Sequence, residues 1–197
     1  MARGTGRNVV LLMTDQQRFD TIAATGNSVI KTPNLDRLAQ EGMLFRNSFV
    51  TNSIRAQIRA VMLTGKYSHL NGLRDNRDQF DGSQQTFPKL LQGAGYQTAI
   101  VGKWHLGDES PSLPNDMGFD SFYGMLFSND QGSPRVWRDR EVVEPHPVDQ
   151  STLTQRYTDE AIAFLHEAAE HLEYRDVHGM LSLFYSERED TANALRC

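Results

Sequence analysis

The sequence predicts an α/β fold in which a mostly parallel, doubly wound sheet is flanked by helices. Residues 8–13 form an apolar run of the kind found in strands buried on both faces of a parallel sheet, and residues 96–101 form a second run that reads as a strand and ends at Gly102. Helical patterns lie between these two runs, so strand, helix and strand alternate along the chain. Polar side chains follow each run, at the carboxyl end of the strand, where such sheets collect their ligands.

The first elements are expected within the N-terminal fifty residues. Asn8–Met13 is predicted as a strand because this run is apolar and ends abruptly at polar residues. Residues 32–42 predict a short helix, with threonine as the N-cap, Pro33 in the first turn and Gly42 as the stop. Phe45–Val50 is read as a second strand.

The remaining elements follow from the same periodicities. In order, the chain is expected to form a helix over 59–65, a helix over 87–93, a strand over 96–101, a polar excursion over 108–147 and an amphipathic helix over 153–172. The segment over 108–147 is rich in proline, glycine and turn signals, so we expect it to be a long excursion over the sheet.

The amino-acid composition excludes several classes of protein function. With 197 residues, 39% of them hydrophobic, the chain can bury one ordinary core, and its net charge of -5 argues against nucleic acid as a partner. The apolar runs are too short to span a membrane, and the N-terminus lacks the pattern of a secretory leader, so a cytoplasmic location is expected. Cys197 is the single cysteine, which excludes a disulfide framework and a cysteine-rich zinc site.

Four segments, taken together and in this order, resemble the sulfatase family of the alkaline phosphatase superfamily. They are residues 8–18, 31–42, 63–72 and 93–107. The resemblance implies an alkaline phosphatase/sulfatase-like fold that is truncated. Residues 1–170 are then the N-terminal part of a sulfatase-like catalytic domain, and residues 171–197 are a divergent tail that does not match the family.

The resemblance also implies a metal site. In that family a divalent cation lies at the end of the first strand, which makes Asp15 and Gln16 the expected ligands here. Calcium is the expected ion, with manganese or magnesium as alternatives, since oxygen ligands suit hard cations. The family's second pair of ligands has no counterpart in the chain. Without the resemblance, Asp15 would be read as an ordinary strand-end or N-cap carboxylate.

The nucleophile position departs from the family. Sulfatases use a cysteine oxidised to formylglycine within a Cys-x-Pro-Ser-Arg motif, and the matching segment here begins with Arg55 and keeps only the closing Arg59. A guanidinium stays protonated and has no lone pair to attack with, so Arg55 can be neither the nucleophile nor a formylglycine precursor. Ser53 is the alternative nucleophile, but it is displaced by two residues, and attack geometry tolerates little misplacement.

Other residues of the family site are retained. By resemblance, Arg59 steadies the charges of the site, while Lys103 and His105 contact the sulfate or the leaving oxygen. Without the resemblance, Lys103 would be a solvated surface cation and His105 a structural histidine. Beside a cation, Arg55 is expected to weaken metal binding or to replace the metal by pairing with Asp15, unless it points into solvent.

The sequence therefore predicts a sulfuric ester hydrolase by descent that is inactive as written, because Arg55 replaces the nucleophile and the C-terminal half is absent. The alternatives are a non-catalytic anion-binding or interaction module that uses the retained cations, and a fragment without function of its own. The expected ligand is a sulfate ester or another small anion, and neither nucleic acid nor a membrane is an expected partner. An exposed sheet edge is expected to favour self-association.

Overall fold

The computed structural model describes residues 8–15, 17–130 and 132–170, and the chain forms two compact units. Of the described residues, 50–164 belong to one unit, while 8–49 and 165–170 belong to the other. The tail predicted over residues 171–197 lies outside the described residues.

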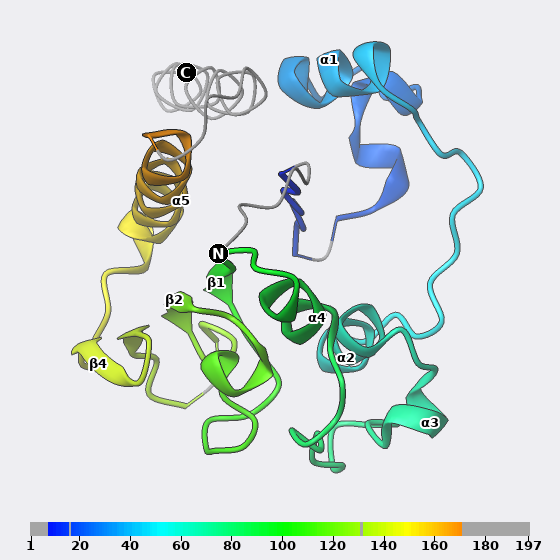
Figure 1. The fold of residues 1–197 in the computed structure, drawn as a ribbon. Coiled ribbons are helices and arrows are strands. Elements are labelled where there is room, and N and C mark those ends of the chain that lie inside the picture. The colour runs from blue at the N-terminus through cyan, green and yellow to red at the C-terminus, as the bar shows by residue number, and fades with distance from the viewer. Residues whose placement is uncertain (1–7, 16, 131, 171–197) are drawn as a thin grey trace. The chain divides into compact units, whose positions relative to one another are not determined.

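The unit of residues 50–164 is built around a four-stranded sheet (Figure 1). The strands β1 (Ala99–Lys103), β2 (Ser121–Met125), β3 (Val136–Arg138) and β4 (Glu141–Glu144) lie in that spatial order. β1 and β2 are parallel, whereas β2–β3 and β3–β4 are antiparallel, so the sheet is mixed. The α-helices are α2 (Arg55–Thr64), α3 (Ser68–Asn71), α4 (Phe87–Gly93) and α5 (Leu153–Glu170). Short 3₁₀ turns are η3 (Pro114–Met117) and η4 (Gln150–Thr152).

Helices pack on both faces of this sheet, as the α/β class requires. Successive strand residues point to opposite faces, so Phe122 and Tyr123 of β2 enter different apolar clusters. Phe122 packs with Ala60 and other residues of α2, whereas Tyr123 packs with Leu153 and Tyr157 of α5. The predicted α/β architecture is therefore confirmed within this unit.

The N-terminal unit contains two 3₁₀ turns and one helix, η1 (Phe19–Thr21), η2 (Ala23–Thr25) and α1 (Pro33–Glu41). The helix begins after Thr32 and ends before Gly42, as the sequence predicts. The Asp36 carboxylate accepts hydrogen bonds from the backbone N–H of Ala24 at 2.7 Å and from the Thr32 hydroxyl at 3.0 Å. These bonds tie α1 to the preceding turns.

The two strands predicted in the N-terminal unit are not formed. Residues 8–13 and 45–50 have no strand hydrogen bonding, and their large side chains are exposed, with Val9 at 73% and Phe49 at 89%. An apolar run becomes a strand only when a neighbouring strand supplies partners for its backbone groups. None of the described residues of this unit forms such a neighbour, so the prediction of a buried strand here was wrong.

The polar excursion predicted over residues 108–147 was wrong in a different way, because it contributes three of the four strands. Its β3–β4 hairpin is short, exposed and charged, which hides the alternation that marks a half-buried strand. Asp139 makes the tight turn between them with φ +54°, a conformation that aspartate tolerates better than most residues. The glycine and proline residues of this segment were read as signs of a long loop, but several of them lie in the turns that connect strands.

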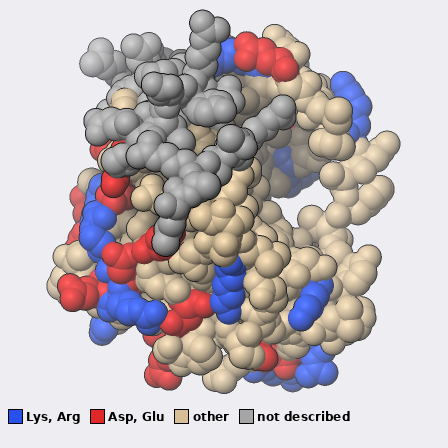
Figure 2. Space-filling view, viewed as in Figure 1, with Lys and Arg blue, Asp and Glu red and all other residues tan. Residues whose placement is uncertain are grey.

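Ion pairs connect α5 to the sheet. Arg138 of β3 binds Glu160 of α5 at 2.5 and 2.9 Å, and Arg156 of α5 binds Glu144 of β4 at 2.6 Å. Figure 2 shows Lys and Arg beside Asp and Glu over β4 and α5. The charges on this face are mixed in sign, which agrees with the modest net charge of the chain.

The sheet has two edge strands in the described part of the chain, β1 and β4. Self-association through one of these edges stays a prediction. Among the described residues, none of the helices has the length and apolar character needed to cross a membrane.

A tyrosine between α5 and the sheet gives a test of this packing at alkaline pH. Burial, with the Tyr123 phenol nearby, raises the pKa of Tyr157 to about 12. Because this pKa lies above the ordinary value of about 10, the neutral phenol stabilises the fold fully below pH 10. That contribution is lost as the pH rises from about 10 to about 12.

We expect Tyr157→Phe to remove this part of the alkaline destabilisation. The wild-type chain should lose about 1–2 kcal/mol more than the variant between about pH 9 and about pH 11.5, a range that allows for partial solvent screening. Urea unfolding followed by circular dichroism at both pH values measures the difference. Parallel pH profiles for the two proteins would contradict the burial of this phenol against the sheet.

Candidate anion site at the carboxyl end of the sheet

The candidate site lies where the parallel strands β1 and β2 end. Lys103, the last residue of β1, is paired in register with Met125, the last residue of β2. Three residues beyond β2 lies Ser128, whose side chain is almost fully buried. Carboxyl ends of parallel strands meet at one edge of a sheet, so residues 25 positions apart in the sequence come together here.

Ser128 joins two of the predicted site residues. Its Oγ accepts a hydrogen bond from Lys103 Nζ at 3.2 Å and a longer one from Arg55 Nη1 at 3.4 Å. Arg55 is the first residue of α2, and its side chain is 35% exposed. Arg55 therefore points toward the lysine end of β1 and does not point away into solvent.

Asp130 completes this group of side chains. Its carboxylate lies 3.9 Å from Arg55 Nη1 and remains largely exposed. A hydrogen bond from the Ser128 hydroxyl, together with the charges of Arg55 and Lys103, lowers the pKa of Asp130 below its usual range. The hydrogen bond from Ser128 is the largest cause of the lowered pKa, and the smaller contributions of Arg55 and Lys103 show that both cations act on this carboxylate.

Arg59 supports the same group from one turn further along α2. Its Nη1 donates a hydrogen bond of 2.6 Å to the backbone carbonyl oxygen of Lys103. Residues four apart lie on the same face of a helix, so Arg55 and Arg59 both reach toward the end of β1. We refer to Arg55, Arg59, Lys103, Ser128 and Asp130 as the cationic cluster.

His105 lies two residues beyond the end of β1, in a constrained backbone conformation. Its φ is +66°, which is uncommon for a residue other than glycine, and its backbone N–H donates to the Leu126 carbonyl at 2.8 Å. The imidazole packs edge-on against the Phe127 ring, with centroids 6.4 Å apart. The chain thus holds His105 beside the segment that leads from β2 to Ser128.

Of the two predicted metal ligands, Asp15 is exposed and belongs to the N-terminal unit, and Gln16 lies outside the described residues. Within residues 8–15, 17–130 and 132–170, no three His, Cys, Asp or Glu side chains are grouped so that they could hold a metal ion. Calcium takes six to eight oxygen ligands, and no group of carboxylates that could supply several of them lies among the described residues, so we derive no chemical step through a metal.

Sequence reasoning missed Ser128 and Asp130. Both residues follow a strand, which is the pattern that selected Lys103. The pattern was missed because the segment that forms β2 was predicted to be part of the polar excursion. Ser53, the alternative nucleophile, is exposed before α2. Trp104, the residue after Lys103, is 1% exposed and packs in the core.

The fold and this cluster define an α/β protein that carries a cationic site at the carboxyl end of its sheet. The sulfatase family model matches residues 7–174, and the chain belongs to the sulfatase family. Members of this family generally use a divalent cation.

Individual relatives agree with this assignment. The chain is 39% identical over 189 residues to the N-acetylglucosamine-6-O-sulfatase of Bacteroides thetaiotaomicron, a match that covers 94% of this chain and 31% of the relative. It is 34% identical over 186 residues to the N-acetylgalactosamine-6-sulfatase of Mus musculus, with 80% and 36% covered. Among solved structures, BT4656 in complex with its substrate D-glucosamine-2-N,6-O-disulfate superposes with a TM-score of 0.62 and 42% identity, over 75% of this chain and 28% of that one. The chain thus spans about a third of the length of the curated relatives it matches.

Proposed function

We propose that this chain binds the sulfate group of a sulfate ester at the cationic cluster and does not hydrolyse the ester. The observation that carries the proposal is the position of Arg55. It stands at the family's nucleophile position, and its guanidinium reaches the same serine hydroxyl as Lys103.

The chemistry of these groups favours binding over turnover. A sulfate group carries spread negative charge, which guanidinium and ammonium groups stabilise through charge-assisted hydrogen bonds. Arg55 has no lone pair with which to attack sulfur, so the site keeps the recognition groups without a nucleophile at that position. A bound anion would also compete with Asp130, whose carboxylate lies 3.9 Å from Arg55 Nη1.

The relatives indicate which sulfate esters to try first. The names of the two curated relatives describe 6-sulfatases of N-acetylated hexosamines, and the ligand of BT4656 is a glucosamine disulfate. We therefore propose carbohydrate sulfates as the ligand class. Calcium binding through Asp15 and Gln16 stays a prediction, as does its weakening by Arg55.

Sulfate titration by calorimetry and by thermal shift tests the proposal. We expect sulfate to bind the wild-type chain and to raise its melting temperature, because a ligand that binds only the folded state stabilises it. Lys103→Ala should weaken binding about tenfold or more, since a hydrogen bond to a charged group contributes about 1.5–3 kcal/mol. Lys31→Ala, which removes an exposed lysine from the N-terminal unit, is the matched control and should bind sulfate like wild type.

Hydrolysis of 4-nitrophenyl sulfate, with calcium or manganese added, tests the second half of the proposal. We expect no turnover above background by the wild-type chain. Turnover that is lost in Lys103→Ala would overturn the proposal, because it would require a nucleophile other than residue 55. Equal sulfate affinity in the wild type and Lys103→Ala would equally rule out the cationic cluster as the binding site.

A further inference from the structure

A pocket opens directly beside the cationic cluster. It has a volume of about 340 Å³, and its wall includes Asp108, Phe127, Ser128, Ser133, Arg135 and Trp137. Ser128 belongs both to this wall and to the cluster, where its hydroxyl meets Lys103 Nζ at 3.2 Å. An anion bound at the cluster would therefore be next to the pocket.

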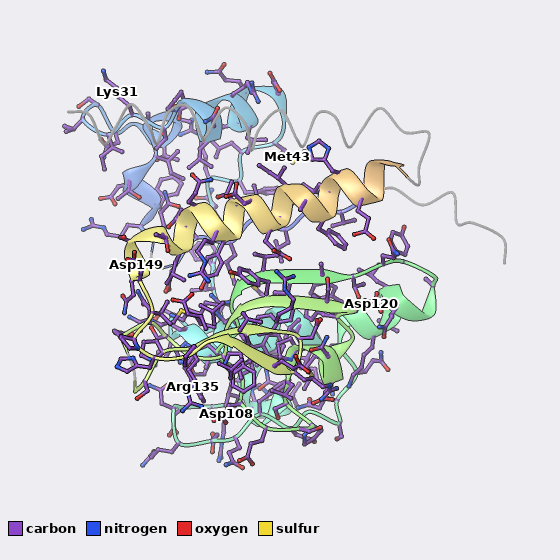
Figure 3. The ribbon with its side chains drawn as sticks, turned by 90° about the vertical axis from the view of Figure 1, so that its left-hand side faces the viewer. Lys31, Met43, Asp108, Asp120, Arg135 and Asp149 are labelled. Carbon is purple, nitrogen blue, oxygen red and sulfur yellow. The ribbon has the colours of Figure 1, made fainter. Side chains whose placement is uncertain are left out.

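The pocket lies at the same end of the sheet as the cluster. Figure 3 shows Asp108 and Arg135 at one end of the sheet and Asp120, which precedes β2, at the other. Asp108 and Ser128 follow the carboxyl ends of β1 and β2, and Arg135 directly precedes β3. This edge of an α/β sheet is the usual position of a ligand, which makes the pocket a natural extension of the anion site.

Its size and lining favour a particular class of ligand. The volume falls near the lower end of the range typical of small-molecule sites, about 300–1,000 Å³, which suits a single ring rather than a chain. Trp137 and Phe127 offer aromatic surface, while Asp108, Ser133 and Arg135 offer hydrogen-bonding groups of both kinds. A ring with apolar C–H faces and several hydroxyl groups matches this combination.

A flat aryl group matches the pocket less well. An aryl ring would cover the carboxylate of Asp108 and the guanidinium of Arg135 without hydrogen-bonding to them, and polar groups that lose water without a new partner oppose binding. Sugar hydroxyls donate to a carboxylate and accept from a guanidinium, so they replace the lost water at both residues.

We propose that this pocket binds the alcohol part of a sulfate ester as a monosaccharide ring, with Asp108 and Arg135 as its specificity-determining residues. The inference rests on the proposed function, since the sulfate group is held at the cationic cluster. It adds a second site, made by residues that the family resemblance did not single out. The pocket then decides which sulfate ester the chain prefers, whereas the cluster decides that it binds sulfate at all.

The test compares the dissociation constants of inorganic sulfate, galactose 6-sulfate and 4-nitrophenyl sulfate by calorimetry. We expect the wild-type chain to bind galactose 6-sulfate about tenfold more tightly than inorganic sulfate, the effect of one or two added hydrogen bonds. It should bind 4-nitrophenyl sulfate no more tightly than inorganic sulfate. In Asp108→Asn and Arg135→Gln, the ratio of sugar sulfate to sulfate affinity should fall toward one.

The choice of variants and ligands distinguishes failure of the pocket proposal from failure of the proposed sulfate binding. Asp108 and Arg135 are exposed, so these near-isosteric changes leave the core intact, and Arg77→Gln serves as a control at an exposed arginine outside the pocket. Binding of sulfate with no preference for the sugar sulfate would overturn the pocket proposal alone. Failure of inorganic sulfate to bind would overturn the proposed function, and this pocket proposal with it. An undiminished preference in both pocket variants would show that other residues hold the sugar.

Discussion

Gly124→Ala is expected to destabilise the chain so strongly that little folded protein is recovered. A Cβ atom added at this position would lie 1.8 Å from the carbonyl oxygen of Gly102 and 2.7 Å from its carbonyl carbon. Both distances are far inside van der Waals contact, and the atoms they involve are backbone, which cannot rotate away. The strands β1 and β2 would have to separate or slip in register.

The expected cost follows from the place of this contact in the fold. Gly102 of β1 and Gly124 of β2 are paired in register in the parallel part of the sheet, one residue before Lys103 and Met125. Forced overlap at such a site costs about 4 kcal/mol or more, a large part of the 5–15 kcal/mol that stabilises an ordinary domain. We expect the melting temperature to fall by about 10 °C or more, and sulfate binding to be lost with the strand ends.

Gly93→Ala is the matched control. Gly93 is the last residue of α4, and a Cβ atom there meets nothing within 4 Å. Alanine is the better helix former by about 0.5–1 kcal/mol, so the melting temperature should stay the same or rise slightly. Differential scanning calorimetry of the three proteins measures both effects. Equal melting temperatures for Gly124→Ala and Gly93→Ala would contradict the described pairing of β1 with β2.

Arg59→Ala is expected to affect both stability and anion binding. The guanidinium donates a hydrogen bond of 2.6 Å to the Lys103 carbonyl, which links α2 to the end of β1 in a partly buried position. A hydrogen bond from a charged donor contributes about 1.5–3 kcal/mol, and its loss leaves the carbonyl without this partner. Because that carbonyl belongs to Lys103, we also expect the sulfate affinity to fall about tenfold.

Two further arginine variants show whether the effect of Arg59→Ala comes from the lost positive charge or from the lost guanidinium at this position. Arg59→Lys keeps the positive charge but not the rigid guanidinium, so it should recover part of the stability and less of the affinity. Arg77→Ala removes an ion pair with Asp75 in which the arginine is 90% exposed, and exposed pairs typically contribute less than 1 kcal/mol. Urea unfolding and sulfate calorimetry provide the two readouts. If Arg59→Ala behaved like Arg77→Ala in both, Arg59 would have no role in holding the end of β1.

Local patterns predicted α1, α4 and the end of α2, but they missed α3 and placed the start of α2 at residue 59 instead of Arg55. Thr32, Pro33 and Gly42 marked the ends of α1, and Gly65 marked the end of α2 with the left-handed conformation that glycine adopts most readily. The strand β1 was also predicted, displaced by a few residues from its observed bounds. These signals are local, because capping and helical periodicity depend on residues within one or two turns of each other.

Local patterns did not predict which segments pair with each other as strands. The run over 8–13 is more apolar than β3 or β4, yet it is exposed and unpaired in the sheet, whereas the charged hairpin of residues 136–144 is part of it. Whether a segment becomes a strand depends on hydrogen bonds to a distant segment, which no local pattern contains.

The sequence by itself determined the family and the α/β class, because each depends on which residue types occur in which order. The replacement of the nucleophile by Arg55 stays a prediction from the resemblance. Only the tertiary structure decided that Arg55 and Lys103 meet at Ser128, that Asp130 lies within their positive charge, and that a pocket adjoins them. The physical reason is that the pairing of β1 with β2 brings together residues far apart in the chain. A binding site at the end of a sheet exists only once that pairing has formed.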